Sequence, residues 1–387
     1  MRLKTHLRSA PLSAWYRAAR RTARYHAAER LGLRVKPLKL RVALTDRCNA
    51  RCVMCNIWQL VDNTAPSLPE ELTVEEMDRM LEVNAGFFSD LRHVALTGGE
   101  PTLRRDLVEI VRTFTRRLPR VTMSFNSNGF STNKLLKMVE EMLTFRKKLT
   151  VMISIDGVGQ GHDVVRGVRN VFRHCEATVD GLVELRKRHK GLKLEINHCM
   201  TAQNVEECER VFEFCRRRDI FFNPIFIVEG QLYHNEGMNV ELGARARERL
   251  IRVIELMRRS DASLQLREII EQLQGKPRDF DCWAGRTQFF IEENGDVFPN
   301  GGCPSSYKMG NLRDFDFDLV GLLRAHEARQ VLAQARQCRL CRLSCETMTT
   351  LAFPEALAGL RRSLAPLPEA DDIRRELPRE LSEISAG

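Results

Sequence analysis

Short apolar segments alternate with amphipathic ones from residue 38 to residue 258, and no other feature of the sequence constrains the fold as strongly. The apolar segments have the length of β-strands, and the amphipathic ones have helical periodicity. Such βα repeats build a parallel sheet whose functional groups gather at the carboxyl ends of the strands. We therefore predict an α/β fold, a partial (β/α)6 TIM-like barrel, with strands at 38–45, 93–97, 121–126, 150–155, 193–200 and 221–228 and helices at 73–84, 104–118, 132–146, 171–189, 204–218 and 241–258.

The pattern changes beyond the barrel. Residues 286–292 alternate like a strand, and Asn294-Gly295 is a favoured hairpin turn before a returning strand at 296–300. A helix is expected at 321–337. These features divide the chain into an N-terminal extension (1–37), the barrel (38–258), a helical bridge (259–281), a small cysteine-rich α+β domain (282–352) and a tail of surface helices or partial disorder (353–387).

The N-terminal extension reads as a basic amphipathic helix. Residues 1–36 carry ten Lys and Arg and a single acid, Glu29. The apolar side is thin and rich in alanine, which favours a helix packed on the body of the protein over one that binds a membrane surface or a partner. The side chains expected to form the packed stripe are Leu12, Trp15, Tyr16, Ala19, Ala23, Ala27 and Leu31.

Twelve cysteines in a chain without a recognisable export signal are expected to be free thiols, because a reducing compartment prevents disulfides. Four are scattered and are expected to be buried small apolar residues: Cys175, Cys199, Cys208 and Cys215. The other eight fall into two groups, and this clustering indicates metal. The first group, Cys48, Cys52 and Cys55, follows the first predicted strand.

Three closely spaced thiolates on a short loop can hold one face of a [4Fe–4S] cluster and leave the fourth iron without a protein ligand. Zinc is the alternative, but it needs a fourth ligand nearby and usually shows pairs of Cys-x2-Cys. The Cys-x3-Cys-x2-Cys spacing, followed by Gly98-Gly99-Glu100-Pro101 after the second strand, resembles the radical S-adenosylmethionine (radical SAM) superfamily. The resemblance implies that the open iron binds S-adenosylmethionine, whose reductive cleavage gives a 5′-deoxyadenosyl radical that abstracts a substrate hydrogen.

The same resemblance assigns further cofactor-binding residues. Gly98, Gly99 and Pro101 belong to the segment that meets the methionyl amine, with Glu100 in support; an ordinary strand-to-helix turn is the alternative. Other positions lie at the ends of the third and fourth strands and on the fifth strand, and the alternatives are a simple turn for Ser154 and a surface salt bridge for Arg166. These residues are Asn128, Ser154, Asp156, Arg166 and Asn197.

An aromatic residue that packs on adenine usually precedes the third cysteine in this family. Met54 occupies that position here, and Trp58 is expected to provide part of the contact. On the fifth strand, Glu195, Asn197 and Cys199 share one face by two-residue alternation. That face is expected to look into the barrel, where these residues either touch substrate or satisfy one another.

The second cysteine group resembles the SPASM/twitch domains of radical SAM enzymes. We predict that Cys282, Cys303, Cys338 and Cys341 hold one auxiliary [4Fe–4S] cluster, with a zinc ribbon as the alternative. Cys345 is left over, as an exchanging ligand or as a catalytic donor of a hydrogen atom or proton. A fully ligated cluster cannot bind substrate, so its expected task is electron transfer.

Electron transfer by the auxiliary cluster favours oxidation of a small polyol, sugar or aminocyclitol. Cys345 as a hydrogen donor would instead favour epimerisation of such a substrate. A radical maturase of a ribosomally made peptide or protein is one alternative, and a non-catalytic iron–sulfur or zinc-binding electron-transfer scaffold is another. Residues 44–49 are also similar to the molybdopterin-precursor cyclase, but the C-terminal cysteine spacing and the diglycine tail of that enzyme are absent.

Charge and hydropathy restrict the partners. The net charge of +10 suits an acidic flavodoxin or ferredoxin as electron donor, and no nucleic-acid-recognition motif is present. No apolar run approaches the roughly 20 residues that span a bilayer. A cytoplasmic location is therefore expected.

Overall fold

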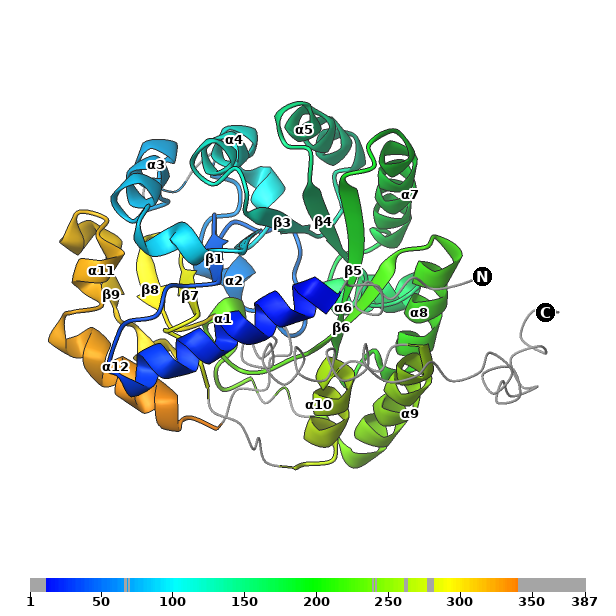
Figure 1. The fold of residues 1–387 in the computed structure, drawn as a ribbon. Coiled ribbons are helices and arrows are strands. Elements are labelled where there is room, and N and C mark those ends of the chain that lie inside the picture. The colour runs from blue at the N-terminus through cyan, green and yellow to red at the C-terminus, as the bar shows by residue number, and fades with distance from the viewer. Residues whose placement is uncertain are drawn as a thin grey trace.

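A computed structural model of the chain describes residues 12–65, 68, 70–238, 240, 242–260, 264–276 and 282–339. Its centre is a sheet with the strand order β6-β5-β4-β3-β2-β1-β7-β8-β9. The first six strands pair in parallel, and helices surround the curved sheet on its outer side (Figure 1). These strands are β1 (Lys39–Ala43), β2 (His93–Thr97), β3 (Thr122–Ser127), β4 (Leu149–Ser154), β5 (Leu192–Met200) and β6 (Phe221–Phe226). The predicted partial barrel is confirmed.

Strand alternation separates the two faces of the sheet. On β2, Val94 and Leu96 pack outward into the hydrophobic core beneath the helices, and Phe125 does the same on β3. The covering helices match the predicted ones to within a few residues. They are α3 (Val74–Val83), α4 (Leu107–Arg117), α5 (Thr132–Phe145), α7 (Phe172–Arg188), α8 (Cys208–Arg217) and α9 (Ala244–Ser260), and α10 (Leu264–Leu273) lies in the predicted bridge. The four scattered cysteines are buried, as predicted.

Two short helices were not predicted, and both lie beside the cysteine loop. α2 (Ile57–Leu60) follows the third cysteine, and α6 (Gln160–Arg166) follows β4. Neither is long enough to show a hydrophobic period. α6 ends where Gly167 adopts a left-handed conformation, with φ of 65°.

The C-terminal strands extend the barrel sheet, although the sequence suggests a separate domain. β7 (Gln288–Ile291) pairs in parallel with β1. β8 (Asp296–Phe298) pairs antiparallel with β7, which confirms the predicted hairpin. β9 (Gly310–Asn311) completes this edge. The pairing of β7 satisfies the backbone groups on the otherwise open side of β1. Beyond it lie α11 (Leu319–Leu322) and α12 (His326–Gln337), the second of which falls in the predicted helix.

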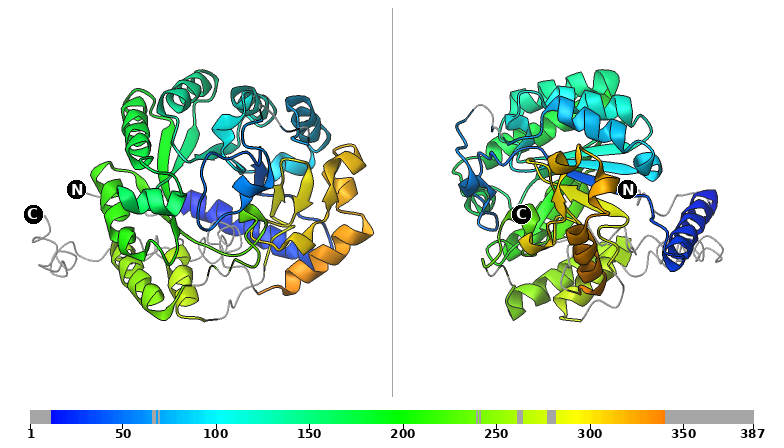
Figure 2. Two further views of the ribbon diagram at one scale, coloured as in Figure 1. Left: turned by 180° about the vertical axis from the view of Figure 1, so that it is seen from behind. Right: turned by 90° about the vertical axis from the view of Figure 1, so that its left-hand side faces the viewer.

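Helix α1 (Leu12–Arg30) lies across the end of the barrel at which the strands begin (Figures 1 and 2). The predicted packing stripe is wrong at Tyr16, which is 60% exposed, and at Leu31, which is 74% exposed, while the side chains of Leu12, Trp15 and Ala19 lie outside the described residues. The helix is instead anchored through Tyr25, which is 4% exposed and donates a hydrogen bond to the carbonyl of Lys36. An ion pair of Glu29 with Arg286 adds a polar attachment that periodicity does not reveal.

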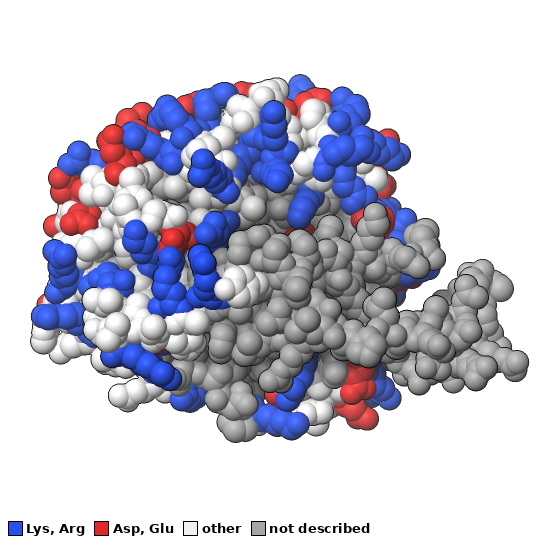
Figure 3. Space-filling view, viewed as in Figure 1, with Lys and Arg blue, Asp and Glu red and all other residues white. Residues whose placement is uncertain are grey.

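Lys and Arg side chains are spread widely over the barrel end on which α1 lies (Figure 3). Among the described residues, no helix combines the length and the apolar character that crossing a bilayer demands.

Phe125 gives a test of the core. Phe125→Ala should lower the free energy of unfolding by about 3–5 kcal/mol, because the side chain is fully buried and its loss leaves a cavity. Phe221→Ala is the matched control, since Phe221 also lies in a strand but is 51% exposed, and it should change stability by no more than about 0.5 kcal/mol. Urea denaturation followed by circular dichroism measures both. Equal losses would contradict the assigned core.

Candidate iron–sulfur site

The three cysteines of the first group lie together in the loop after β1. The backbone N–H of Cys48 donates to Asn63 Oδ1 at 2.6 Å, and that of Cys55 donates to the Cys52 carbonyl at 3.2 Å, so the loop curls around the thiols. Burial raises the pKa of Cys55 to about 12, and the neighbouring Cys52 adds to this rise. The thiols are therefore protonated at neutral pH, and binding of a cluster would release their protons.

Helix α6 holds this loop from the other side. The N–H of Arg51 donates to the Arg166 carbonyl at 2.9 Å, and the N–H of Val53 donates to the Val165 carbonyl at 3.0 Å. Gly167 makes the approach possible, because a Cβ there would lie 2.2 Å from the Arg51 carbonyl oxygen. The segment 164–167 and the cysteine loop are thus packed backbone to backbone.

Arg166 reaches from α6 into the site. Its Nη1 donates to Cys52 Sγ at 3.5 Å, and its Nη2 lies 2.7 Å from Asp156 Oδ2. The Arg166 and Asp156 side chains are 9% and 0% exposed, so a surface salt bridge is ruled out. Burial disfavours the charged guanidinium, but Asp156 outweighs this effect, and the pKa of Arg166 is raised. Arg166 Nε is buried without a hydrogen-bond partner among the described residues, which leaves a donor for a carboxylate.

Asp156 is itself held in place by neighbouring strands. Its Oδ1 accepts a hydrogen bond from the Cys199 N–H at 2.8 Å, and its carbonyl accepts one from Asn204 Nδ2 at 2.9 Å. The Asp156 N–H donates to His162 Nδ1, and burial lowers the pKa of His162 to about 2. His162 is therefore a neutral acceptor that fixes the turn after β4.

The Gly98-Gly99-Glu100-Pro101 segment packs tightly on the cysteine loop. Gly99 N–H donates to the Thr45 carbonyl at 2.7 Å, and Glu100 N–H donates to the Arg47 carbonyl at 2.8 Å. A Cβ on Gly98 would lie 2.4 Å from the Thr45 oxygen, and one on Gly99 would lie 2.3 Å from the Arg47 oxygen. No hydrogen bond from the described residues reaches the carbonyls of Gly98 and Gly99, so these carbonyls are the groups left to meet a ligand amine.

Glu100 links this segment to β3. Its carboxylate accepts hydrogen bonds from Thr102, from Ser127 Oγ at 2.9 Å and from the Asn128 N–H at 2.7 Å, although burial raises its pKa. Pro101 begins the short 3-10 helix Pro101–Leu103. Asn128 Nδ2 in turn donates to Asn49 Oδ1, between the first and second cysteines, at 2.6 Å. Glu100 and Asn128 therefore connect the end of β3 to the cysteine loop and help to hold it in place.

The predicted residues of β4 and β5 lie on the inner face of the barrel. Ser154 is the last residue of β4, and it pairs in register with Asn197. Asn197 Oδ1 accepts a hydrogen bond from Asn223 Nδ2 of β6 at 2.9 Å, so the two amides satisfy one another in part. Burial raises the pKa of Glu195, deeper on the same face. The structure thus brings polar side chains of three strands together.

Met54 and Trp58 occupy different surroundings. Met54 is 3% exposed and belongs to an apolar cluster with Val165, Cys199 and Ile225. Trp58 donates from Nε1 to the Cys55 carbonyl at 2.9 Å, and the Arg51 guanidinium lies 5.9 Å from its ring centre. Met54 therefore faces the barrel interior, whereas the Trp58 ring is hydrogen-bonded to the cysteine loop.

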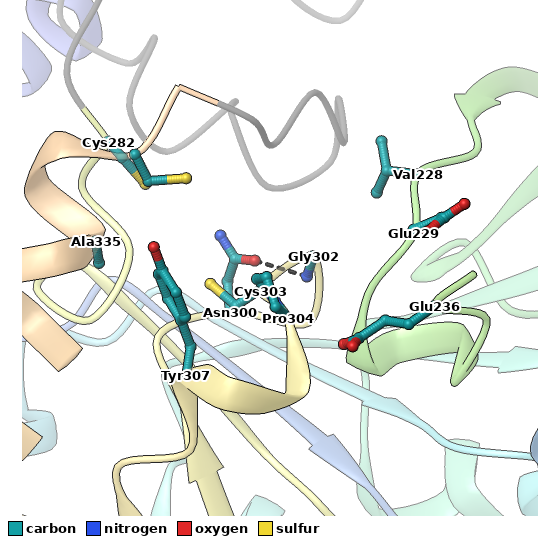
Figure 4. A pocket seen from close by; sticks show the side chains of 11 residues that line it. Val228, Glu229, Glu236, Cys282, Asn300, Gly302, Cys303, Pro304, Tyr307 and Ala335 are labelled. Atoms are coloured by element: carbon teal, nitrogen blue, oxygen red, sulfur yellow. Dashed lines mark hydrogen bonds between the residues drawn. The ribbon is translucent and has the colours of Figure 1, made fainter. Parts of the chain in front are cut away.

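The second cysteine group surrounds a cavity of about 360 Å³. Cys282, Cys303 and Cys338 line it, together with Tyr307 and Glu236 (Figure 4). The segment after β6 forms the opposite wall, because the Gln231 N–H donates to the Cys303 carbonyl at 3.0 Å. Cys341 and Cys345 lie outside the described residues.

One cluster of ionisable groups was missed by sequence reasoning. Burial raises the pKa of both Asp46 and Glu293, and each carboxyl group is close enough to influence the pKa of the other. His234 Nε2 lies 3.4 Å from Glu292 Oε1, and the φ of His234 is 45°, a conformation rare for residues other than glycine. Glu292 and Glu293 directly follow β7, so the strand-end rule could have identified them.

The donor set at the first site fits a cluster with an open iron. Cys52 lies near enough to raise the pKa of both Cys48 and Cys55 in the same loop, the buried Arg166 guanidinium donates to Cys52, and a Cβ on either glycine would overlap the backbone of the loop.

Comparison with known proteins finds similarity over about half of the chain. A family model described as the radical SAM superfamily matches residues 42–215. The Fe-coproporphyrin III synthase of Methanosarcina barkeri is 27% identical over 207 residues, which cover 52% of this chain and 48% of that protein. The pre-heme d1 synthase of Dinoroseobacter shibae is 29% identical, covering 51% and 46%. The GTP 3′,8-cyclase of Aliarcobacter butzleri is 28% identical, covering 49% and 55%. The chain spans about half the length of these curated relatives.

Solved structures share the fold at low identity. Native anSMEcpe with bound AdoMet has a TM-score of 0.57 and 18% identity, covering 85% of this chain and 98% of that one. Streptococcus suis SuiB bound to the precursor peptide SuiA has a TM-score of 0.58 and 17% identity, covering 80% and 70%. These similarities establish the architecture.

The glycine cradle gives a test of cosubstrate binding. Gly99→Ala should weaken S-adenosylmethionine binding by at least about tenfold, because its Cβ would displace the carbonyl of Arg47 and with it the cysteine loop. Gly86→Ala is the matched control, since nothing lies within 4 Å of a Cβ at that position. Equilibrium dialysis of anaerobically reconstituted protein measures the affinity. Unchanged affinity in the first variant would show that the segment does not shape the binding site.

The radical SAM family uses a [4Fe–4S] cluster and S-adenosylmethionine, and the loop of Cys48, Cys52 and Cys55 lies within the matched residues. A radical SAM superfamily model matches residues 42–215, and the fold and the geometry of the cysteine loop within those residues agree with that match.

Proposed function

We propose that this protein is a two-cluster radical SAM enzyme that removes a hydrogen atom from a small polar substrate and oxidises or epimerises it. The observation that carries the proposal is the segment after β6, residues 228–236, which touches both cysteine sites. Its Asn235 Nδ2 donates to the Met54 carbonyl at 3.1 Å, and its Tyr233 carbonyl accepts from the Asn56 N–H at 2.9 Å. In the same segment, the Gln231 N–H donates a hydrogen bond to the carbonyl of Cys303 in the second site.

The first site would generate the radical. When bound, the cluster supplies the electron that cleaves S-adenosylmethionine to a 5′-deoxyadenosyl radical. Cys48, Cys52 and Cys55 would hold the cluster, and the carbonyls of Gly98 and Gly99 would receive the methionyl amine. Arg166 would orient the cosubstrate carboxylate or ribose, because Asp156 fixes its guanidinium and its Nε is free to donate. The electron would come from a flavodoxin or a ferredoxin.

The second site would hold an auxiliary [4Fe–4S] cluster. Three of the proposed ligands, Cys282, Cys303 and Cys338, surround one cavity, and Cys341 is the proposed fourth. Full ligation by protein suits electron transfer, which favours net oxidation of the substrate. Cys345 as a hydrogen-atom or proton donor would give epimerisation instead.

Polar groups in the barrel interior support the proposed substrate class. Asn197 and Asn223 offer amide groups on its inner face, and the carboxyl groups of Asp46 and Glu292 with His234 offer acceptors and a cation partner near the strand ends. Such groups suit the hydroxyl and amino groups of a polyol, sugar or aminocyclitol. The curated relatives are named for a porphyrin, a heme precursor and GTP, and these names support a small-molecule substrate.

A peptide maturase is the second candidate. It is favoured by the similar fold of SuiB, whose structure contains a precursor peptide. Neighbouring genes separate the two readings, because a short precursor-peptide gene would support maturation and sugar-biosynthesis genes would support the small-molecule reading. A non-catalytic scaffold would make no 5′-deoxyadenosine when reduced with S-adenosylmethionine present.

Iron content gives a quantitative test of the two-cluster proposal. Anaerobic reconstitution should load about eight irons per chain, because two four-iron clusters are present. Replacing Cys48, Cys52 and Cys55 with alanine should leave about four irons and abolish 5′-deoxyadenosine formation on reduction with dithionite. Replacing Cys282, Cys303 and Cys338 should also leave about four irons but retain cleavage of S-adenosylmethionine. Zinc at the second site would contradict its proposed redox role.

A further inference from the structure

Exposed apolar side chains gather around the loop that carries the first cysteine group. Val53 is 36% exposed, Leu60 is 48% exposed and Val164 is 54% exposed. Val53 lies between two cysteines, Leu60 ends α2, and Val164 lies in α6. The hydrogen bond from the Val53 N–H to the Val165 carbonyl holds the loop and α6 side by side. Figure 2 (left) shows this loop on the near face of the barrel, opposite the end covered by α1.

The exposed side chains lie on the outer side of backbone that carries a proposed cluster ligand. Cys52 points inward, because its Sγ receives the hydrogen bond of the buried Arg166. Its neighbours Arg51 and Val53 are both exposed, as expected for alternating side chains on an extended segment. A single layer of backbone therefore separates the outer surface from a thiolate of the radical-generating site.

This surface has a positive charge. Arg51, Arg169 and Arg173 are exposed, and none of them forms an ion pair within the described part of the chain. The nearby Asp163 is committed to the backbone, since its carboxylate accepts from the N–H groups of residues 170–172. The exposed Asp62 is the opposing charge on the loop, and it is hydrogen-bonded to Thr64. The excess of positive over negative side chains on this surface favours an acidic partner.

We propose that Arg51, Val53, Leu60, Val164 and Arg169 form a docking surface, the cluster-loop patch, for a small acidic protein that donates single electrons. The inference rests on the proposed function, because only a redox centre beneath the patch gives the docking a purpose. Apolar side chains rimmed by unpaired cations suit transient association, in which charge steers the encounter and a small apolar area stabilises it. The step transfers one electron from the reduced donor to the first cluster.

The test compares two reductants. The double variant Val164→Asp/Arg169→Glu should lower 5′-deoxyadenosine formation by about tenfold when a purified acidic flavodoxin and its reductase supply electrons, because both changes repel an acidic partner. With dithionite, which needs no docking surface, the rate should stay within about twofold of the wild type. The flavodoxin-driven rate of the wild type should also fall as salt is added, and that of the variant should respond less.

Charge reversal on the opposite face is the control. Val83→Asp/Arg120→Glu makes the same two exchanges at exposed positions before β2 and β3, and it should leave the flavodoxin-driven rate unchanged. An equal loss in both double variants would overturn the patch, as would a normal flavodoxin-driven rate in Val164→Asp/Arg169→Glu. A wild type that works with dithionite but not with flavodoxin also overturns it. A wild type inactive with dithionite overturns the proposed function instead.

Discussion

The buried contact between Arg166 and Asp156 is the interaction on which the site depends. It joins α6 to the end of β4, and Arg166 extends it to Cys52 of the loop after β1. Removing one partner of a buried ion pair typically costs about 3–5 kcal/mol, whereas an apolar replacement of the whole pair is often neutral. The pair therefore contributes more to orientation than to stability. The ion pair holds the Arg166 guanidinium next to the thiol of Cys52, which must lose its proton to become a cluster ligand.

Close contacts between backbone segments hold the cysteine loop in place. Gly98, Gly99 and Gly167 all face carbonyl groups of the cysteine loop, and at each of them a Cβ would overlap an oxygen. N–H groups of Gly99 and Glu100, which follow β2, hold the loop on one side, and the loop's own N–H groups donate to α6 on the other. These backbone contacts hold the loop of the three cysteines, and the side chains of Asn49, Asn63 and Trp58 add hydrogen bonds to it.

The sequence predicted the barrel because apolar periodicity is a local property, and β2 (His93–Thr97) matches its predicted bounds. The placement of Cys48, Cys52, Cys55 and the glycine segment at strand ends followed from the same pattern. Contacts between residues that lie far apart in the sequence were not predicted. The attachment of α1 through Tyr25 depends on a hydrogen bond to Lys36 and a contact with Trp283. The pairing of Glu292 with His234 joins residues from two separate strand ends, and nothing in local periodicity encodes it.

The parallel pairing of β7 with β1 has a consequence for the order of folding. Lys39 stands opposite Gln288, so one side of the first barrel strand waits for a partner almost 250 residues further along the chain. Contacts of such large sequence separation slow folding, and until they form the unpaired edge is open to other strands. During synthesis on a ribosome, β1 and the cysteine loop that follows it would therefore be completed late, after most of the domain has emerged.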